Sequence, residues 1–207
     1  MKIVKITGQV ELLSGLHIGG GDDTMKIGGI DNSVIKHANG GEPYIPGSSL
    51  KGKMRSLLEW HYHLVGLGDG KPFSSKLLNK VLNADDKTNA ENLLKLFGDS
   101  SESNEFGITR ISVGDCNLNQ DSKGMELSEA KYENTIDRQK GTAAHPRQSE
   151  RVPAGVSFDF DIRIKVLEED SEEELIAMLK QGLKLVENDY LGGSGSRGYG
   201  RVQFKLD

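Results

Sequence analysis

The chain has 207 residues with 26 basic and 31 acidic side chains, which gives a formal net charge of −5 at pH 7. At about 150 residues per domain, this length predicts one domain with insertions rather than several modules. The 35% of apolar residues, 26 glycines and 5 prolines exclude collagen-like and disordered chains. Because the sequence has a single cysteine and no apolar run of about 18 residues, we expect a cytoplasmic protein without membrane association, disulfides or structural zinc.

The net charge hides two basic patches. Six of the acids lie in the run EEDSEEE at 168–174, and without that run 26 basic residues face 25 acidic ones. Residues 43–58 and residues 190–206 each carry three basic side chains and no acidic one. Local patches rather than totals decide phosphate binding, so the acidic balance does not exclude a nucleic-acid partner. The acids of 168–174 have a structural explanation as partners of a helix N-terminus.

Periodicity predicts six secondary-structure elements in chain order. Residues 1–13 and 155–166 alternate apolar and polar side chains, which is typical of half-buried strands. Ser171 and Glu174 form a capping-box pattern that opens a helix. The complete prediction is β (1–13), α (48–66), β (106–114), β (155–166), α (171–187) and β (200–206).

This βαββαβ order is that of the ferredoxin-like fold, an α+β arrangement with two helices on one face of a four-stranded antiparallel sheet. RNA-recognition modules use open sheets of this type, although many activities share the fold. We expect a single domain over 1–207, interrupted by insertions at 14–47, 67–105 and 115–154. The second insertion predicts a helical lobe. The third is polar, lacks a clear period and is too long for a simple connection.

A Gly-rich segment, GGSGSRGYGR at 192–201, precedes the last strand. Glycines let a backbone approach closely, and arginine presents forked donors to phosphate. The segment follows a helix and opens a strand, which is the reverse of a P-loop or a dinucleotide fingerprint. It is either a simple turn or a phosphate-binding loop, for which the candidate residues are Gly192, Gly193, Gly195, Arg197 and Gly198.

The other basic patch, PGSSLKGKMR at 46–55, opens the first predicted helix. Lys51 and Arg55 are four residues apart and share one helical face. Ser48 and Ser49 stand at the helix N-terminus, where backbone N–H groups attract anions. The patch is therefore either a solvated basic face or a phosphate-binding site.

Two further candidates lie in the first insertion. His17 precedes Gly19 and Gly20, and it is the histidine that we place beside a Gly-built binding loop. Asp31 lies in KIGGIDNSVIK, where it is either a turn residue or a functional carboxylate. The sequence offers no Ser/His/Asp or Cys/His arrangement for nucleophilic catalysis.

Five motifs give the chain a family resemblance: GLHIGGG at 15–21, IPGSSLKGKMR at 45–55, YENTIDR at 132–138, HPRQSERV at 145–152 and NDYLGGSGSRGYGR at 188–201. Together they resemble the RAMP superfamily of CRISPR proteins and, more narrowly, the repeated backbone subunit of the type III-A effector, the Csm complex. The resemblance covers most of the chain apart from 67–100, and the shared order of the motifs makes it specific.

The resemblance implies an RNA-guided complex in which copies of this chain stack along one CRISPR guide RNA beside other effector subunits. The guide selects its target by base pairing, so the protein reads backbone and shape. The Gly-rich segment, the basic helix and the Gly-built loop of the first insertion would contact the guide. The insertion 115–154 would be a thumb-like β-hairpin that wedges into the guide–target duplex, with Arg138 and Arg147 as RNA contacts.

The resemblance also implies that Asp31 takes part in cleaving complementary target RNA. An RNA strand carries its own nucleophile, the 2′-OH, and a wedge that distorts the duplex can bring this group in line with the phosphorus. Asp31 would accept the 2′-OH proton or help to hold a loosely bound Mg²⁺ or Mn²⁺. The expected products carry 2′,3′-cyclic phosphate and 5′-hydroxyl ends.

Three alternatives stay open at this point. The chain could be a guide-binding scaffold that does not cut RNA. It could instead be an endoribonuclease that processes precursor guide RNA without a metal, using His17. An enzyme for a phosphorylated small molecule is a third alternative, but it explains neither the two separate basic patches nor the insertion 115–154.

Overall fold

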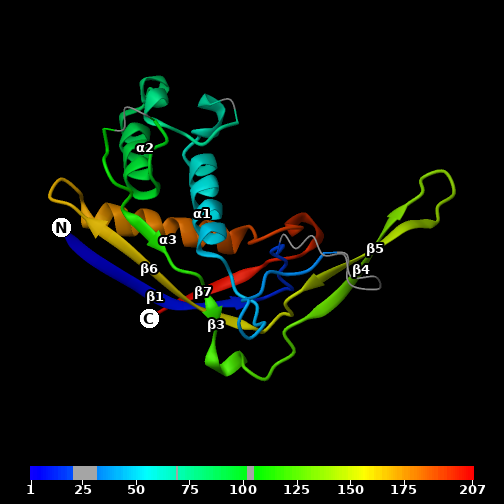
Figure 1. The fold of residues 1–207 in the computed structure, drawn as a ribbon. Coiled ribbons are helices and arrows are strands. Elements are labelled where there is room, and N and C mark those ends of the chain that lie inside the picture. Colours follow the sequence, from blue (N-terminus) through cyan, green and yellow to red (C-terminus); the bar gives the residue numbers. More distant parts are fainter. Residues whose placement is uncertain (21–31, 69, 102–104) are drawn as a thin grey trace.

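A computed structural model of the chain describes residues 1–20, 32–68, 70–101 and 105–207 (Figure 1). The strands are β1 (Lys2–Leu12), β2 (Ile111–Val113), β3 (Asn117–Leu118), β4 (Glu129–Ile136), β5 (Ala143–Arg151), β6 (Ser157–Val166) and β7 (Val202–Leu206). The α-helices are α1 (Gly47–His61), α2 (Ala84–Phe97) and α3 (Glu172–Asn188). Short 3₁₀ helices span Val65–Leu67, Ser75–Lys80, Gln120–Ser122 and Gly195–Arg197.

The main sheet has the strand order β2-β6-β1-β7, and its neighbouring strands are antiparallel. The short strand β3 pairs with β6 beyond the end of β2. In β1 and β6 the apolar positions are in register, so that Val10 lies opposite Phe158 and Ile6 opposite Ile162. Alternation along both strands therefore gives the sheet one apolar face, which the helices cover.

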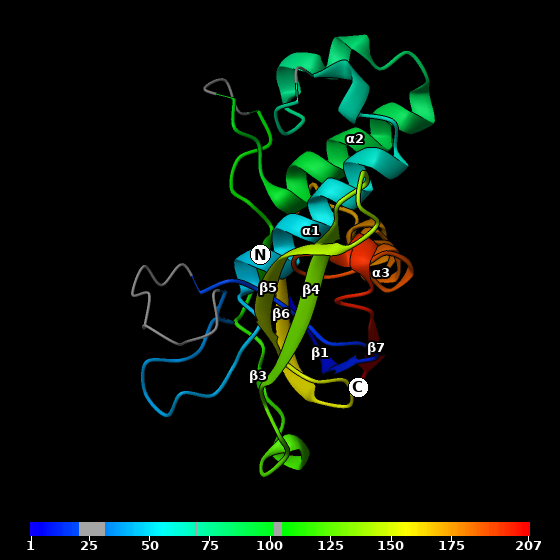
Figure 2. The ribbon, with the colours of Figure 1, turned by 90° about the vertical axis from the view of Figure 1, so that its right-hand side faces the viewer.

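Helices α1 and α3 pack on this apolar face, as both ribbon views show (Figures 1 and 2). Leu50, Met54 and Leu58 of α1 are fully buried at helical spacing. In α3 the hydroxyl of Ser171 accepts a hydrogen bond from the backbone N–H of Glu174, at 3.4 Å, so the expected N-cap is present. None of the described helices packs on the opposite face of the sheet (Figures 1 and 2).

Residues 67–105 contribute to the same core. Helix α2 buries Leu93, Leu94 and Phe97 against α1 and α3, and these side chains belong to one hydrophobic cluster with the sheet. Gly98 ends the helix at a φ of +97°. Helix α2 of this insertion is therefore packed on the body.

Two of the predicted boundaries are wrong. The strand predicted at 106–114 spans only Ile111–Val113, because the guanidinium of Arg110 donates to the backbone carbonyls of Phe106 and Ile108 and holds the preceding residues in a loop. The helix predicted at 48–66 ends at His61. His63 has a φ of +58°, a left-handed conformation that a right-handed helix does not contain.

The strands β4 and β5 form a separate two-stranded hairpin that projects from the body (Figure 1). Their register places Glu133 opposite Arg147 and Glu129 opposite Arg151. Most of its side chains are exposed or half-buried on both faces.

The chain's single cysteine, Cys116, lies in the body. It pairs with Ile45 through backbone hydrogen bonds and is fully buried.

Candidate nucleic-acid interface

The Gly-rich segment forms a tight loop between α3 and β7. Gly192 has a φ of +75°, and a Cβ atom at this position would lie 2.5 Å from the carbonyl oxygen of His17. At Gly195 a Cβ atom would lie 2.0 Å from Cγ of Tyr190 and would overlap the aromatic ring. Both positions therefore exclude a side chain, because real Cβ atoms do not approach other atoms so closely.

The loop lies against the segment that carries His17. The N–H of Gly193 donates to the carbonyl of His17 at 2.9 Å, and the N–H of Gly200 donates to the carbonyl of Gly15 at 3.0 Å. A Cβ atom on Gly193 would lie 3.8 Å from the His17 ring. The structure thus brings together two of the regions that the sequence singled out, although more than 170 residues separate them in the chain.

The imidazole of His17 is oriented by the end of β5. Its Nδ1 lies 2.6 Å from the backbone carbonyl of Glu150. A carbonyl only accepts hydrogen bonds, so Nδ1 is the donor and Nε2 is left as the other functional nitrogen. Nε2 lies 3.7 Å from where a Cβ atom on Gly19 would stand, so the ring faces the glycines that follow it.

The side-chain carboxylate of Glu150, the residue whose backbone carbonyl orients His17, is itself held by several hydrogen bonds. It accepts hydrogen bonds from Lys36 and Ser128, each at 2.6 Å, and from the backbone N–H of Val34 at 2.9 Å. Burial favours the neutral acid, but these hydrogen bonds and the charge of Lys36 outweigh burial and lower the pKa of Glu150. Glu150 is therefore an ionised structural anchor rather than a free acid or base.

The predicted catalytic residue, Asp31, lies outside the described residues, as does the whole of 21–31. The described residues on either side are tied to the same region. The N–H of Ile35 donates to the carbonyl of Ile18 at 2.8 Å, and the N–H of Glu150 donates to the carbonyl of Asn32 at 2.9 Å. The described residues that flank 21–31 therefore lie beside the base of the hairpin.

The N-terminus of α1 is fixed against the main sheet. The N–H of Gly47 donates to the carboxylate of Asp115 at 2.8 Å. Ser48 is exposed and Ser49 half-buried, and the first turn contains no acidic residue. Lys51 is half-buried one turn further on, where burial and the positive charge of Arg55 lower its pKa.

Arg55 has a structural role in addition to its place on this face. Its Nε donates to Glu59 at 2.8 Å, and its terminal nitrogens donate to the backbone carbonyls of Gly98 at 3.0 Å and Phe73 at 2.8 Å. The side chain is only 18% exposed. Arg55 therefore ties α1 to the insertion, and Lys51 has the freer cation of the two.

A lysine that the sequence analysis did not single out joins α1 to the Gly-rich loop. Nζ of Lys53 lies 2.6 Å from the carboxylate of Asp189 and 3.7 Å from the centroid of the Tyr190 ring. The same ring packs on Gly195. Tyr190 is thereby held between a cation and the loop backbone, which fixes the position of the loop relative to the basic helix.

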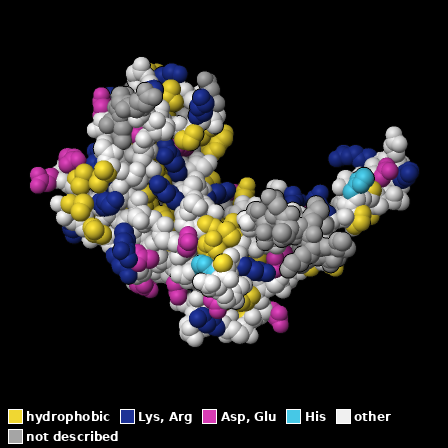
Figure 3. All heavy atoms as spheres, in the orientation of Figure 1, with side chains coloured by type: hydrophobic (Ala, Val, Ile, Leu, Met, Phe, Trp, Pro, Cys, Tyr) yellow, Lys and Arg dark blue, Asp and Glu magenta, His cyan; other side chains and the backbone are white. Residues whose placement is uncertain are grey.

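The hairpin carries exposed cations at its tip and along its length. Arg138 and Lys140 are exposed in the turn, where the carboxylate of Asp137 accepts hydrogen bonds from the N–H groups of Gln139 and Lys140. Basic side chains gather at the end of the projecting arm in the space-filling view (Figure 3). Arg147, further down, is 46% exposed.

Glu133 joins the hairpin to the Gly-rich loop. Its carboxylate lies 3.1 Å from Nε of Arg197, 3.4 Å from Nε of Arg147 and 3.6 Å from Nζ of Lys131. Burial opposes ionisation, but the hydrogen bonds and charges of these side chains outweigh it and lower the pKa of Glu133. Glu133 lies in the motif YENTIDR, where the sequence alone indicated no role for it.

Tyr199 lies at the base of this cluster. Its side chain is 1% exposed, with Nζ of Lys131 4.3 Å from the ring centroid and the Arg151 guanidinium carbon 5.2 Å away. Burial and the nearby charge of Glu133 raise the pKa of Tyr199. Within the described part of the chain, its buried hydroxyl has no partner at ordinary hydrogen-bond geometry, and the carboxylate of Glu133 is the neighbouring acceptor that acts on it.

The uncovered face of the main sheet differs from the hairpin end. Apart from the exposed Ile3, its side chains are polar or charged, including both partners of the pairs that Asp161 makes with Lys5, at 3.3 Å, and Arg163, at 3.1 Å. Among the described strand residues of this face there is no aromatic side chain of the kind on which RNA-recognition modules stack bases. The outward residues are Ile3, Lys5, Thr7, Gln9, Glu11, Ser112, Ser157, Asp159, Asp161, Arg163, Lys165, Gln203 and Lys205.

Comparison with known proteins gives the family. A profile of the RAMP superfamily matches residues 9–203. The chain belongs to the RAMP superfamily. It is 41% identical to "CRISPR system Cms endoribonuclease Csm3" of Enterococcus italicus, covering 99% of this chain and 90% of the relative. It is 43% identical to the protein of the same name in Methanocaldococcus jannaschii, covering 98% and 78%.

Solved structures agree with this RAMP assignment. A crystal structure of the Csm3-Csm4 subcomplex in the type III-A CRISPR-Cas interference complex matches with a TM-score of 0.59 and 31% identity, over 99% of this chain and 76% of that one. A type III-B Cmr-beta complex bound to cognate target RNA matches with a TM-score of 0.63 over the full chain and 60% of its own. At 16% identity, this second match shows a shared fold alone.

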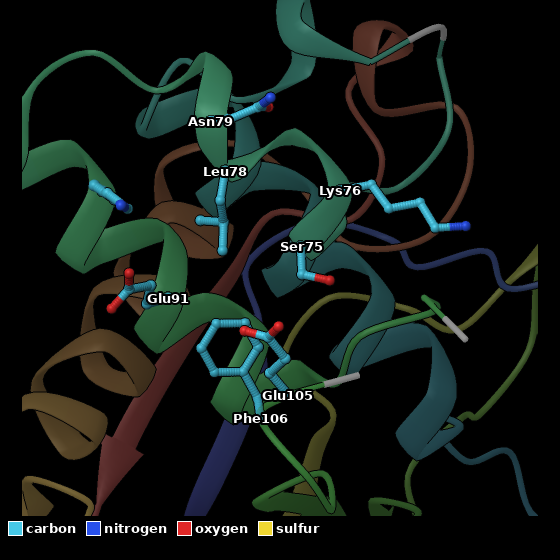
Figure 4. Close-up of a pocket in the computed structure, with 8 residues that line it drawn as sticks. Ser75, Lys76, Leu78, Asn79, Glu91, Glu105 and Phe106 are labelled. Carbon is cyan, nitrogen blue, oxygen red and sulfur yellow. The ribbon is translucent and has the colours of Figure 1, made fainter. Parts of the chain in front are cut away.

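This RAMP chain also has a cavity of about 430 Å³ on its helical insertion (Figure 4). Its lining mixes Lys76 and Lys87 with Glu91 and Glu105. Figure 1 places α2 and the projecting hairpin on opposite sides of the molecule, so the cavity is remote from the Gly-rich loop. In the described part of the chain, no helix combines the length and the apolar character that a bilayer crossing requires.

Proposed function

We propose that this chain is a backbone subunit of a type III-A CRISPR effector, which binds guide RNA and cleaves the complementary target RNA. The observation that carries the proposal is that the His17 segment, the Gly-rich loop and the base of the basic hairpin meet at one end of the molecule. The relatives named as Csm3 endoribonucleases support the activity. The Csm3-Csm4 subcomplex supports other effector subunits as partners.

The proposal includes a single ferredoxin-like RAMP domain over 1–207, with insertions at 14–47, 67–105 and 115–154. The strand order β2-β6-β1-β7, with α1 and α3 on one face, supports this arrangement. One continuous hydrophobic cluster that includes α2 supports a single domain. In this proposal copies of the chain form a filament along the guide RNA in the cytoplasm.

Guide binding uses the Gly-rich loop and the N-terminal turn of α1. Gly192, Gly193 and Gly195 let the loop pack closely on His17 and Tyr190, and the open Cβ position of Gly198 leaves the loop backbone accessible to a phosphate. Ser48, Ser49 and Lys51 supply hydroxyl, backbone and ammonium donors. Arg55 supports this face from behind, since Glu59, Gly98 and Phe73 already engage its guanidinium. His17, Gly19 and Gly20 line the same end.

The hairpin of β4 and β5 acts as the thumb. It projects from the body, and Arg138 at its tip is exposed, so it can reach a guide–target duplex bound along the loop (Figure 1). An inserted thumb displaces a base pair and distorts the adjacent target backbone. This distortion brings a 2′-OH in line with its phosphorus, and positioning of this kind supplies much of a rate acceleration.

In the cleavage step, Asp31 accepts the proton of the target 2′-OH. The 2′-oxygen then forms a bond to phosphorus while the bond to the 5′-oxygen of the next nucleotide breaks, and that oxygen gains a proton. The products are a 2′,3′-cyclic phosphate and a 5′-hydroxyl. His17 is a candidate to bind the neighbouring backbone, because its ring is already oriented by Glu150.

A loosely bound Mg²⁺ or Mn²⁺ is a further part of the proposal. Oxygen ligands such as those of Asp31 and Asn32 suit these ions, which would neutralise charge on the phosphate. The described residues do not by themselves form a metal site: they contain no group of three or more His, Cys, Asp or Glu side chains that could hold an ion. Glu150 is already paired with Lys36.

The test uses the effector reconstituted with a guide RNA and end-labelled complementary RNA, with Mg²⁺ or with a chelator. Wild type and the control Asp23→Ala should cut at regular intervals, whereas Asp31→Ala should bind the target equally well and leave it intact. If every complex binds and none cuts, the chain is a scaffold. If no complex holds target RNA, the proposed function is wrong.

The alternative of metal-independent precursor processing rests on the packing of His17 beside the Gly-rich loop. In that case the imidazole would move the proton, and the reaction would resist chelation. His17→Ala would then abolish cleavage of precursor guide RNA while Asp31→Ala would not. The opposite pattern on target RNA supports the main proposal.

A further inference from the structure

Glu133 holds cations from two separate elements at the place where the hairpin meets the Gly-rich loop. Arg147 comes from β5 and Arg197 from the loop, and the Nε atom of each lies within 3.4 Å of the same carboxylate. The side chain of Glu133 is 10% exposed, whereas those of Arg147 and Arg197 are 46% and 47% exposed. The acceptor is therefore covered, and the cations face outward.

The cluster carries more positive charge than its carboxylate can neutralise. Lys131, Arg147 and Arg197 share the single charge of Glu133, which leaves an excess of two positive charges. The neighbouring Arg151 has its own partner, Glu129, at 2.5 Å, so it adds nothing to this excess of positive charge. One terminal nitrogen of Arg197 donates to Oγ of Ser194 at 2.5 Å, and each outward guanidinium keeps further terminal N–H donors that a phosphate can engage.

A second observation at the same place is the buried hydroxyl of Tyr199. The side chain is 1% exposed, the Lys131 ammonium covers its ring at 4.3 Å, and the carboxylate of Glu133 lies close enough to the hydroxyl to raise its pKa. Tyr199 therefore lies beside the same carboxylate that holds the cations, and its ring packs under the Lys131 ammonium.

We infer that Glu133 is a positioning residue for RNA: it holds Arg147 of the hairpin and Arg197 of the Gly-rich loop side by side, so that together they bind one backbone phosphate at the junction of thumb and loop. The inference rests on the proposed function, because it assumes that the chain binds RNA. Glu133 itself stays behind the two guanidinium groups. Preorganising two long side chains removes an ordering cost that RNA binding would otherwise carry.

This role predicts an effect opposite in sign to simple electrostatics. Removing a carboxylate from a phosphate-binding surface should tighten RNA binding if charge alone matters, because it removes a repulsion. If Glu133 positions the arginines, Glu133→Gln should weaken guide-RNA binding by about tenfold. The matched control is Glu126→Gln, an exposed carboxylate just before the hairpin, which should bind equally well or slightly more tightly.

The measurement is the dissociation constant of the full chain for labelled guide RNA, by fluorescence anisotropy at several salt concentrations. Arg147→Ala and Arg197→Ala should each lower the slope of log Kd against log salt by about 0.7 to 0.9. In the double Arg147→Ala, Arg197→Ala background, Glu133→Gln should cause no further weakening. A purely structural role would weaken binding in either background. Glu133→Asp, which keeps the charge, should recover part of the affinity.

Two outcomes would overturn the inference. One is Glu133→Gln binding as tightly as Glu126→Gln or more tightly, and the other is weakening that persists without the two arginines. Thermal unfolding of each variant identifies any loss that comes from misfolding, and Glu133→Asp then carries the comparison. If wild type and Glu126→Gln also fail to bind guide RNA at every salt concentration, the proposed function fails, and the inference fails with it.

Discussion

The protein contains two arginine–carboxylate clusters that differ in how completely they are satisfied. In the body, Arg110 is 1% and Asp170 0% exposed, and the pair is bidentate, at 3.0 and 3.2 Å. Asp170 also accepts the N–H of Leu167 at 2.9 Å. At the hairpin, Glu133 faces three cations, two of which are about half in solvent. A buried and saturated pair fixes the fold, whereas an unsaturated and exposed cluster keeps donors for a ligand.

The largest expected effect breaks the buried pair. Arg110→Ala leaves the Asp170 carboxylate buried without its cation and frees the carbonyls of Phe106 and Ile108, so we expect a loss of about 3–5 kcal/mol in the free energy of unfolding. Denaturant titration measures it. The control Arg163→Ala, which removes an exposed pair with Asp161, should cost less than about 1 kcal/mol. Equal losses would erase the distinction between buried and exposed pairs.

The next effect falls on the ligand-binding side of the comparison. Gly195→Ala places a methyl group 2.0 Å from Cγ of Tyr190. The side chain of Lys53, on α1, lies over the same ring. The loop must shift, at a cost of about 1–3 kcal/mol, and guide-RNA affinity should fall by about tenfold or more. Gly66→Ala, where a Cβ atom meets nothing within 4 Å, is the control. Unchanged RNA affinity in Gly195→Ala would show that the loop does not need this conformation.

Acidification should affect the stabilising contributions of the Asp170 and Glu133 carboxylates to different extents. Burial opposes ionisation of Asp170, but Arg110 and the N–H of Leu167 outweigh it and lower its pKa. A carboxyl whose pKa is lowered by folding stabilises the protein above its unfolded pKa, about 3.9, and this contribution is lost as pH falls through the folded pKa. The urea concentration at the unfolding midpoint should therefore decrease as the pH is lowered below about 4, and it should decrease less steeply in Asp170→Asn. Glu133→Gln should change the pH dependence of the urea midpoint less than Asp170→Asn does, since the arginine partners of Glu133 are about half in solvent.

The smallest expected effect concerns the connection between helix and loop. Lys53→Ala removes a partly exposed ion pair with Asp189 and a cation–π contact with Tyr190, together about 1 kcal/mol. The amide of Gly193, which donates to His17, should then exchange its hydrogen faster. Lys184→Ala, which removes an exposed pair with Glu187, should leave that amide unchanged. Equal exchange in both variants would mean that Lys53 does not hold the loop.

The fold could be predicted where one face of an element is buried. The alternation in β1 and β6 and the capping box at Ser171 gave elements close to those observed. The hairpin gave no such signal, because both of its faces are largely in solvent and no burial imposes an apolar period on it. The family resemblance, not periodicity, indicated a hairpin in this insertion. The prediction at 106–114 was too long because a distant carboxylate, Asp170, fixes Arg110 and its loop.

The candidate site was predictable only in part. Glycines and cations stand out in sequence, so the Gly-rich loop and Lys51 could be chosen from composition. Arg55 looks the same as Lys51 in sequence, yet tertiary contacts to Gly98 and Phe73 occupy it. Glu133 was missed because its meaning depends on cations 14 and 64 residues away in the chain. The position of Asp31 lies outside the described residues, so its role stays a prediction.

The buried cysteine makes the protein convenient for spectroscopy. Burial, with a contribution from Asp115, raises the pKa of Cys116 to about 12, and the side chain is 0% exposed. Because the thiolate is the reactive form, maleimide dyes should not label the native protein near neutral pH. A cysteine introduced at Lys140 would then be the single attachment point for a fluorophore, without first removing a native thiol. Such a label at the hairpin tip could follow the approach of the hairpin to an RNA duplex in real time.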